Sequence, residues 1–338
     1  MRTPDRLSVR PLSILLTLLA ILPLLAAGCE TSSAPESPKL LTASSADLWT
    51  YNGVAGWRIV TPHYVIYTTI RKEEVRSRLP LIMEGALAQY RALAPEVQLT
   101  SRPMECYVFE ERREWNEFTR QITGRDAPIF LQIRRGGYTL GDRYVAYYIG
   151  VQSTASVTSH EGWHQFLARH FVGRLPPFLE EGLACTFEGV SWDDASSLPC
   201  WNTSLNRIRA DELRNALENN QCWPLEKLIT MHAGQVVNQP GEKVEAFYAQ
   251  CWAFARFMRD ADNGRYRPAL ERWIAETACG TCYDPTHSHT RVGLPWNPAG
   301  IHLMLEHYLG MPLPEIQEEY TAYMNKIANE HTITGGEL

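Results

Sequence analysis

The apolar positions of the chain repeat with two different periods. Between about residues 57 and 150, short β-branched and aromatic runs alternate with longer stretches in which apolar residues recur every three or four positions. The runs predict strands, and the longer stretches predict helices that cover them. The predicted strands span residues 58–60, 64–67, 104–109, 129–133 and 144–149, and the helices among them span residues 73–93 and 112–122.

Helical periodicity dominates the rest of the chain. One helix is expected from about residue 154 to residue 171, a second begins near Pro177, and six more follow. Those six span residues 205–218, 225–231, 246–259, 267–277, 300–309 and 313–329. Strands first and helices later predict the α+β class, with an N-terminal mixed sheet, a helix pair and then a mainly helical lobe. We expect strand 144–149 to edge a cleft between two lobes, where an extended peptide could pair with it.

The first 28 residues have the organisation of an export signal. Three arginines precede an apolar run, which ends in Leu-Ala-Ala-Gly before Cys29. This ending resembles a bacterial lipobox, which implies cleavage before Cys29 and a lipid on its side chain. An uncleaved transmembrane anchor is the alternative, but the run is shorter than the roughly 20 apolar residues of a membrane span. We therefore expect an exported protein, anchored by lipid in a bacterial cell envelope.

The domain organisation expected after the signal is simple. A polar tether rich in serine and proline occupies residues 29–46, and one domain occupies residues 47–338. Within that domain we expect a β-rich lobe at about 47–152, two metal-binding helices at about 153–190 and a helical lobe at about 191–338.

The charge of the chain limits the kinds of partner that we expect, and its cysteine count limits the disulfides. The 338-residue chain has a net charge of −6, and loss of three arginines and one aspartate with the signal lowers it to −8. Since no block of lysines and arginines occurs, nucleic acid is not an expected partner, and no organic cofactor is expected. Seven cysteines remain besides Cys29, so at least one should stay unpaired within the chain. Cys200 and Cys222 are the pair that we expect to be bridged.

The strongest chemical signal is His160-Glu161-Gly162-Trp163-His164. Residues four apart lie on one face of a helix, so the imidazoles of His160 and His164 can bind one metal ion. Two imidazoles favour Zn²⁺, and a third protein ligand would leave one position for water. The carboxylate of Glu161 is placed to take a proton from that water. The alternative is an amphipathic helix that carries two histidines by accident.

A second helix supplies acidic residues. Pro176-Pro177-Phe178-Leu179-Glu180-Glu181-Gly182-Leu183-Ala184 begins with prolines suited to a first helical turn, and Glu181 follows His164 by seventeen residues. Together with the His-Glu-x-x-His sequence, this segment resembles the gluzincin metallopeptidases, especially the aminopeptidase N group. The resemblance implies that Glu181, rather than Glu180, binds zinc. It also implies that Glu188 holds a ligand histidine in its tautomer, whereas the plain alternative is a solvated carboxylate.

The resemblance extends to a further residue and a wider family. Tyr248 follows Glu181 by 67 residues, and a tyrosine at a similar distance in the aminopeptidase N group donates a hydrogen bond to the oxyanion. A tyrosine that only packs at the core margin is the alternative. The glycine-rich sequence with which that group binds a free amino terminus is absent, so aminopeptidase activity is not implied. From about Ala46 onward the chain also resembles an uncharacterised bacterial family of peptidase-MA-like proteins.

A second cysteine and histidine cluster lies near the C-terminus. Cys279 and Cys282 form a Cys-x-x-Cys pair, and His287 and His289 follow. Such a cluster can bind structural zinc or act as a redox pair, but in an exported protein a disulfide or an exposed loop is favoured.

The sequence thus predicts an envelope peptidase with one catalytic Zn²⁺ held by His160, His164 and Glu181. Glu161 would be the general base, Tyr248 would stabilise the oxyanion, and the substrate would be a peptide or protein cut at internal bonds. The alternative is a non-catalytic lipoprotein that uses a gluzincin-like core to bind peptides or the envelope. An intact Glu161 counts against that alternative, because a scaffold needs the metal ligands but not the base.

Overall fold

The structure is a computed structural model that describes residues 45–133, 136–193, 196–286 and 297–330. The expected export signal, Cys29, His287 and His289 lie outside these residues. The described residues belong to one compact unit. None of their helices is both long and apolar enough to cross a membrane.

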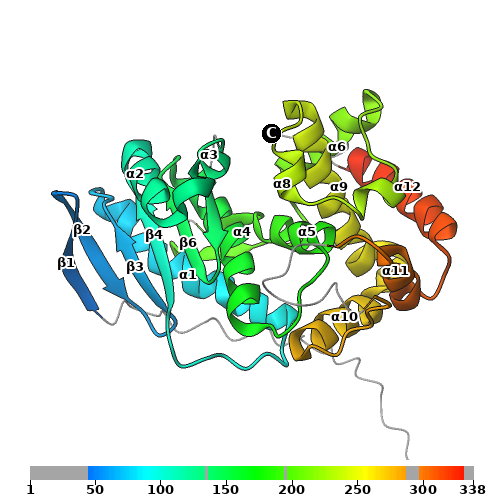
Figure 1. Ribbon diagram of the computed structural model, residues 1–338, viewed down its shortest axis with the longest axis horizontal. Helices are drawn as coiled ribbons and strands as arrows, with labels where there is room; N and C mark the ends of the chain where they lie inside the picture. Colours follow the sequence, from blue (N-terminus) through cyan, green and yellow to red (C-terminus); the bar gives the residue numbers. More distant parts are fainter. Residues whose placement is uncertain (1–44, 134–135, 194–195, 287–296, 331–338) are drawn as a thin grey trace, which may run out of the picture. The chain divides into compact units, whose positions relative to one another are not determined.

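A six-stranded mixed sheet forms the first part of the described chain (Figure 1). Its strands lie in the order β1-β2-β3-β4-β6-β5. The pairs β3/β4 and β4/β6 are parallel, and the other three pairs are antiparallel. The strands are β1 (Ser45–Tyr51), β2 (Val54–Val60), β3 (Tyr64–Thr68), β4 (Met104–Phe109), β5 (Gly137–Leu140) and β6 (Arg143–Tyr147).

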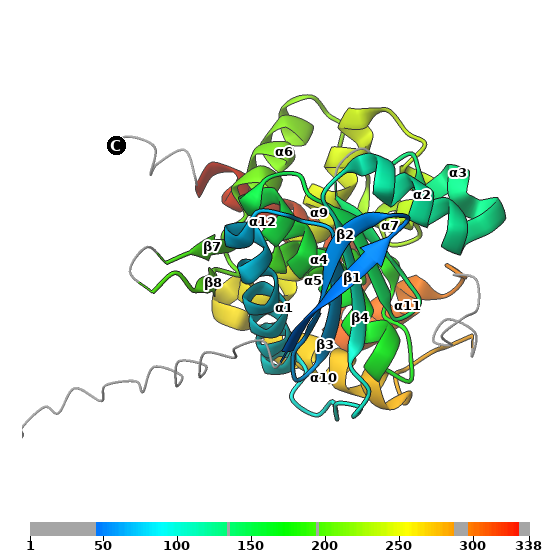
Figure 2. The ribbon, with the colours of Figure 1, turned by 90° about the vertical axis from the view of Figure 1, so that its left-hand side faces the viewer.

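Different helices cover the two faces of this sheet, as Figure 2 shows for α1 and α2. Successive side chains of β4 point to opposite faces. Cys106 and Val108 belong to the main core, which includes side chains of α1 (Glu73–Leu93) and α4 (Val151–His170). Phe109 faces the other way and packs in an aromatic cluster with α2 (Arg112–Thr123). The helix α4 is therefore fixed on the sheet by α1 and by the strands beside it.

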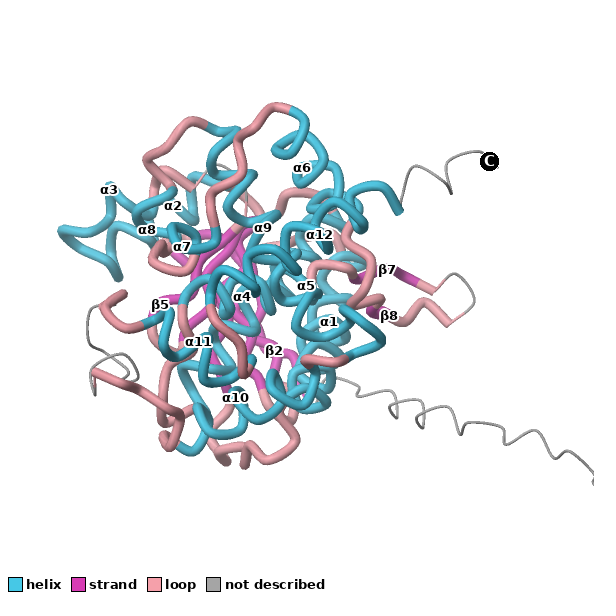
Figure 3. Tube along the Cα trace, turned by 90° about the vertical axis from the view of Figure 1, so that its right-hand side faces the viewer, coloured by secondary structure: helices cyan, strands magenta, loops and turns pink. Residues whose placement is uncertain are grey.

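The remainder is mainly helical, with α9 at its centre. Nearly every side chain of α9 from Ala246 to Met258 is buried, and α5, α6 and α12 pack around it (Figure 3). The helices of this part are α5 (Pro177–Phe187), α6 (Arg207–Glu218), α7 (Leu225–Leu228), α8 (Ala233–Val236), α9 (Gly241–Asp260), α10 (Arg267–Cys279), α11 (Ile301–Leu309) and α12 (Leu313–Glu330). The α+β class and the mixed N-terminal sheet expected from the sequence are confirmed.

Two predictions about strands are wrong. Residues 129–133 form the end of the short helix α3 (Ala127–Phe130) and a turn. Proline at position 128 favours a first helical turn there and cannot donate to a sheet. Residues 144–149 were expected at the edge of the cleft, but β6 lies between β4 and β5. The strand at that edge of the sheet is β5, which was not predicted.

Besides β5, three strands were missed. The strand β1 begins at Ser45, inside the segment expected to be a tether, and pairs with β2 along its whole length. The strands β7 (Val190–Trp192) and β8 (Pro199–Trp201) form a hairpin between α5 and α6.

The expected bridge between Cys200 and Cys222 is also wrong, since neither cysteine forms a disulfide. Cys200 lies in β8, beside Trp201, whose ring packs over Gly85 of α1. Cys222 instead lies near Lys243 of α9. Packing of the two segments on different helices keeps the thiols apart.

Candidate metal centre

The helix α4 presents two imidazoles on one face. His160 and His164 lie one turn apart, and their Nε2 atoms are 3.2 Å from each other. The helix is held there by α1, because the hydroxyl of Tyr90 donates to the carbonyl oxygen of Ser159 at 2.5 Å. Gly162 faces the same tyrosine, and a Cβ at this position would lie 2.5 Å from the Tyr90 oxygen. The glycine inside the His-Glu-x-x-His sequence therefore allows α1 and α4 to pack closely.

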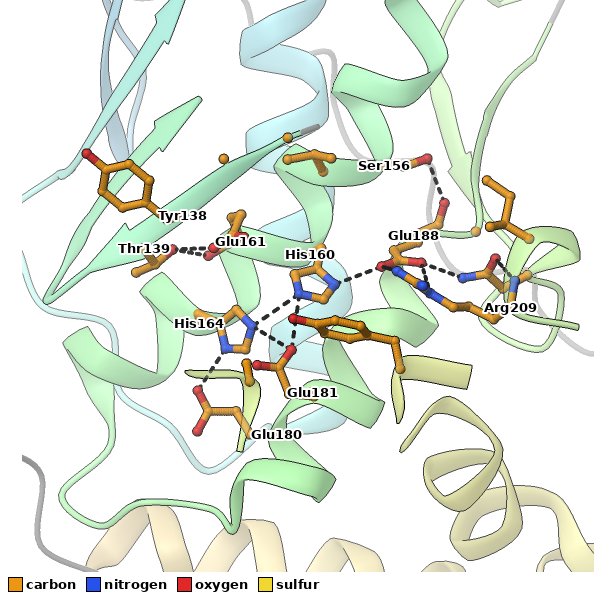
Figure 4. Close-up of a pocket in the computed structure, with 18 of the residues that line it drawn as sticks. Tyr138, Thr139, Ser156, His160, Glu161, His164, Glu180, Glu181, Glu188 and Arg209 are labelled. Atoms are coloured by element: carbon orange, nitrogen blue, oxygen red, sulfur yellow. Dashed lines mark hydrogen bonds and ion pairs between the residues drawn. The ribbon is translucent and has the colours of Figure 1, made fainter. Parts of the chain in front are cut away.

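The helix α5 brings Glu181 to the imidazoles. Its glycine neighbour Gly182 lies against α9, where a Cβ would be 2.2 Å from the carbonyl oxygen of Cys251. Glu181 Oε2 is 3.4 Å from Nε2 of His160 and 3.5 Å from Nε2 of His164. A tetrahedral ion with bonds of about 2.0–2.1 Å sets its ligand atoms about 3.3–3.4 Å apart. These three side chains, drawn in Figure 4, could therefore hold a metal ion.

The electrostatics of the three side chains favour a cation. Oε2 of Glu181 is buried, and no hydrogen-bond partner is found for it among the described residues. Burial by itself raises the pKa of Glu181, but His164 and His160 lower it well below its usual range. Burial lowers the pKa of His164, but the carboxylates of Glu181 and Glu180 raise it to about 10. A divalent cation would supply the positive charge that this buried carboxylate requires.

Each histidine has a carboxylate on its other ring nitrogen. Nδ1 of His160 is 2.9 Å from Oε1 of Glu188, and Nδ1 of His164 is 2.7 Å from Oε1 of Glu180 (Figure 4). A carboxylate in this position fixes the tautomer, so that Nδ1 donates and Nε2 keeps a lone pair for a metal. The contact of Glu188 is the one that the resemblance implies.

The role of Glu180 was missed by sequence reasoning. Adjacent residues of a helix point about 100° apart, so the two glutamates can meet different sides of His164. The pair of acidic residues at the start of α5 was a signal for this arrangement, but only one of the two was given a role.

A largely buried ion pair supports Glu188 from the opposite side. Arg209 and Asn206 of α6 both bond its carboxylate, as Figure 4 shows for Arg209. Asn206 also caps α6, since its side chain accepts from the backbone N–H of Arg209 at 3.2 Å. The sequence can predict Asn206 as a helix cap, but no pattern in it predicts the contact between Arg209 and Glu188.

Glu161 lies beside the two histidines on the side of the edge strand. The hydroxyl of Thr139 in β5 is 3.0 Å from Oε2 of Glu161 and 2.9 Å from its carbonyl oxygen. Figure 4 shows Glu161 between Thr139 and His160. The threonine therefore connects the carboxylate expected to act as base with the wall of the cavity.

Tyr248 reaches the same group of side chains from α9. Its ring centroid is 6.4 Å from that of His160, in an edge-on arrangement. Burial raises the pKa of the phenol well above its usual value, and the charge of Glu181 adds to the rise. The hydroxyl thus remains a donor at neutral pH. The structure thus brings the five residues expected in the centre, His160, Glu161, His164, Glu181 and Tyr248, around one cavity.

That cavity has a volume of about 1580 Å³. It exceeds the roughly 300–1,000 Å³ usual for small-molecule sites. Its walls come from β5, α4, α5, β7, α6, α8 and α9. Space of this size beside an edge strand can accommodate part of a polymer.

The cysteine and histidine cluster expected near the C-terminus is only partly described by the structure. Cys279 is the last residue of α10 and Cys282 lies three residues beyond it, and the two histidines lie outside the described residues. A different set of side chains, His160, Cys185 and Glu188, could also hold a metal.

Comparison with known proteins does not identify the chain. A scan against protein-family models finds no match, and a search of curated proteins finds none either. Sequence and structure together define an α+β protein in which histidine and glutamate side chains could hold a metal ion.

Proposed function

We propose that the chain is a zinc-dependent peptidase that cleaves peptides or proteins at internal bonds. The observation that carries the proposal is the triangle formed by His160, His164 and Glu181, with Glu161 beside it on the open cavity. The resemblance to gluzincins, which rests on the same residues, supports this assignment. The contacts of Glu180 and Glu188 with the two histidines support it further, since metal-binding imidazoles almost always have such partners.

The donor set favours Zn²⁺ over harder cations. Two neutral imidazoles and one carboxylate suit zinc, and three protein ligands would leave a further position open for water. A Zn²⁺ ion bound there would polarise a scissile carbonyl and lower the pKa of water from about 15.7 to about 7.

The protein's own side chains would carry the proton and orient the reacting groups. Glu161 takes the proton from the attacking water and returns it to the leaving amine. Thr139 fixes the carboxylate of Glu161 through its hydroxyl. Tyr248 donates to the oxygen of the scissile carbonyl as negative charge develops on it. The size of the cavity and the absence of a sequence for binding a free amino terminus favour cleavage at internal bonds.

The proposal includes the place of the reaction. The apolar run before Cys29 and its resemblance to a lipobox favour export and lipid attachment, which would tether the peptidase to a membrane of the bacterial envelope.

Cleavage of a random peptide library tests this function. Purified protein should cleave internal bonds, lose activity with a chelator and recover it when Zn²⁺ is restored. Glu161→Gln should abolish cleavage and keep its zinc, because the amide cannot accept the proton. Glu271→Gln, a change at an exposed position of α10 outside the cavity, is the control. Zinc-loaded wild type that cleaves nothing would favour the non-catalytic binding protein, and an active Glu161→Gln variant would remove Glu161 as the base.

A further inference from the structure

Arg209 is a largely buried cation that contacts Glu188 and Tyr248 of the metal centre. Its side chain is 16% exposed. Nη2 donates to Oε1 of Glu188 at 2.9 Å and Nε donates to Oε2 at 3.0 Å, so the guanidinium binds this carboxylate in a bidentate manner. Nη1 donates to Glu212 at 2.7 Å, and the guanidinium lies 5.2 Å from the ring centroid of Tyr248.

These bonds occupy Glu188 completely. Oε1 meets Nδ1 of His160 and Nη2 of Arg209, and Oε2 accepts from Nε of Arg209 and from Nδ2 of Asn206 at 2.7 Å. Each carboxylate oxygen has two lone pairs, so all four are used. Glu188 can then serve His160 only as a hydrogen-bond acceptor.

A second set of side chains that could hold a metal ion shares His160. The ligand atoms of His160, Cys185 and Glu188 all lie within 4.8 Å of one another. A thiolate is a strong zinc ligand, so this set could bind the ion that the set with His164 and Glu181 is proposed to hold. Both sets share His160, and a neutral imidazole has one N–H and one nitrogen lone pair. His160 can therefore bind an ion through Nε2 or through Nδ1, but not through both.

We propose that Arg209 is a positioning residue that commits His160 to the site formed with His164 and Glu181. By saturating Glu188 it keeps that carboxylate on Nδ1 of His160, leaves Nε2 for the metal, and prevents Glu188 and Cys185 from binding the ion. This inference rests on the proposed function, since it concerns where the catalytic metal binds.

Binding of Co²⁺ in place of Zn²⁺ tests the inference without measuring activity. Wild type should bind Co²⁺ with the visible bands of nitrogen and oxygen ligands and without thiolate-to-cobalt charge-transfer absorption. Arg209→Met keeps an apolar stem beneath Tyr248 and removes the donors. It should lower Co²⁺ affinity by about 10–100-fold, the usual effect of losing an outer partner, and produce the charge-transfer band. Adding Cys185→Ser to Arg209→Met should remove that band.

Arg256→Met is a matched control. Arg256 is 9% exposed, pairs with Asp260 at 3.4 Å and lies 5.3 Å from the ring of Trp252, but it is not part of the cavity wall. Its replacement should leave the cobalt spectrum and affinity unchanged. If Arg209→Met does not fold, Arg209→Lys supplies the test, because lysine keeps the charge without bidentate geometry; it should give a smaller loss of affinity and a weaker thiolate band.

The outcomes separate the two proposals. Wild type that binds no Co²⁺ would overturn the proposed function and the inference with it. Wild type that binds Co²⁺, with Arg209 variants that match it in both spectrum and affinity, would overturn the role of Arg209 alone.

Discussion

Replacement of Glu180 tests whether the carboxylate beside His164 contributes to metal binding. Glu180 Oε1 is 2.7 Å from Nδ1 of His164, and its side chain is 19% exposed. This is the geometry of a strong charge-assisted hydrogen bond with limited access for water. Loss of such a partner costs about 10–100-fold in metal affinity, or about 1.4–2.7 kcal/mol.

Two substitutions of Glu180 separate the effect of losing its charge from the effect of losing its hydrogen-bond acceptor. Glu180→Gln retains an oxygen that can accept from Nδ1 and loses only the charge, so we expect a loss near the lower limit, about 10-fold. Glu180→Ala removes the acceptor as well, so we expect a loss near the upper limit, about 100-fold. Zn²⁺ affinity is measured by competition with a chromophoric chelator at fixed pH, with Glu271→Gln as the control. If Glu180→Ala bound zinc as tightly as the control, the contact between Glu180 and His164 would have no role in holding the metal.

Three further changes test separate parts of the account. Tyr248→Phe should lower kcat by about 10²–10³-fold, the effect of losing one oxyanion donor, with unchanged zinc content; full activity would return Tyr248 to a packing role. Burial, aided by the charge of Arg169, lowers the pKa of His170 from 6.5 to about 4. As pH drops through this range the unfolded chain binds a proton before the folded chain does, so the free energy of unfolding should fall. In thermal unfolding His170→Leu should lose less stability than wild type between these pH values, and equal losses would contradict this reasoning. Cys29→Ala should abolish acylation and membrane retention, and an unchanged mass of the mature N-terminus would argue against lipid attachment.

The sequence predicted long periodic elements best. The helix at 73–93 and the strand at 104–109 have the predicted bounds, because a clear apolar period and flanking polar residues define each end. The predictions failed where pairing partners decide the structure. The strand β5 has four residues and begins with glycine, so only its alignment with β6 makes it a strand.

One missed strand did leave a signal in the sequence. Asn52 and Gly53 have φ values of 46° and 81° and join β1 to β2. Asn-Gly between two β-rich runs is a strong hairpin signal, but the polar composition before it favoured a tether instead. Each residue of β1 pairs with one in β2, and this pairing stabilises the segment as a strand.

In the candidate site, the sequence predicted the arrangement of residues that are close in the chain better than contacts between residues that are distant in it. The i, i+4 spacing of His160 and His164 places both rings on one face of α4, and Glu181 was reached through resemblance. The contact of Arg209 with Glu188 depends on how α6 packs beside α5 and α9, which no local pattern determines. The contact of Thr139 with Glu161 likewise depends on the register of an edge strand.

Zinc content tests the central claim most directly. Wild type, Glu181→Gln and Glu271→Gln are purified in the same way, dialysed against a weak chelator and analysed for metal per chain. Wild type and Glu271→Gln should retain about one zinc ion, and Glu181→Gln should lose most of it because an anionic ligand has been removed. Wild type without zinc, or Glu181→Gln that retains as much as wild type, would contradict the assignment of His160, His164 and Glu181 as the metal site.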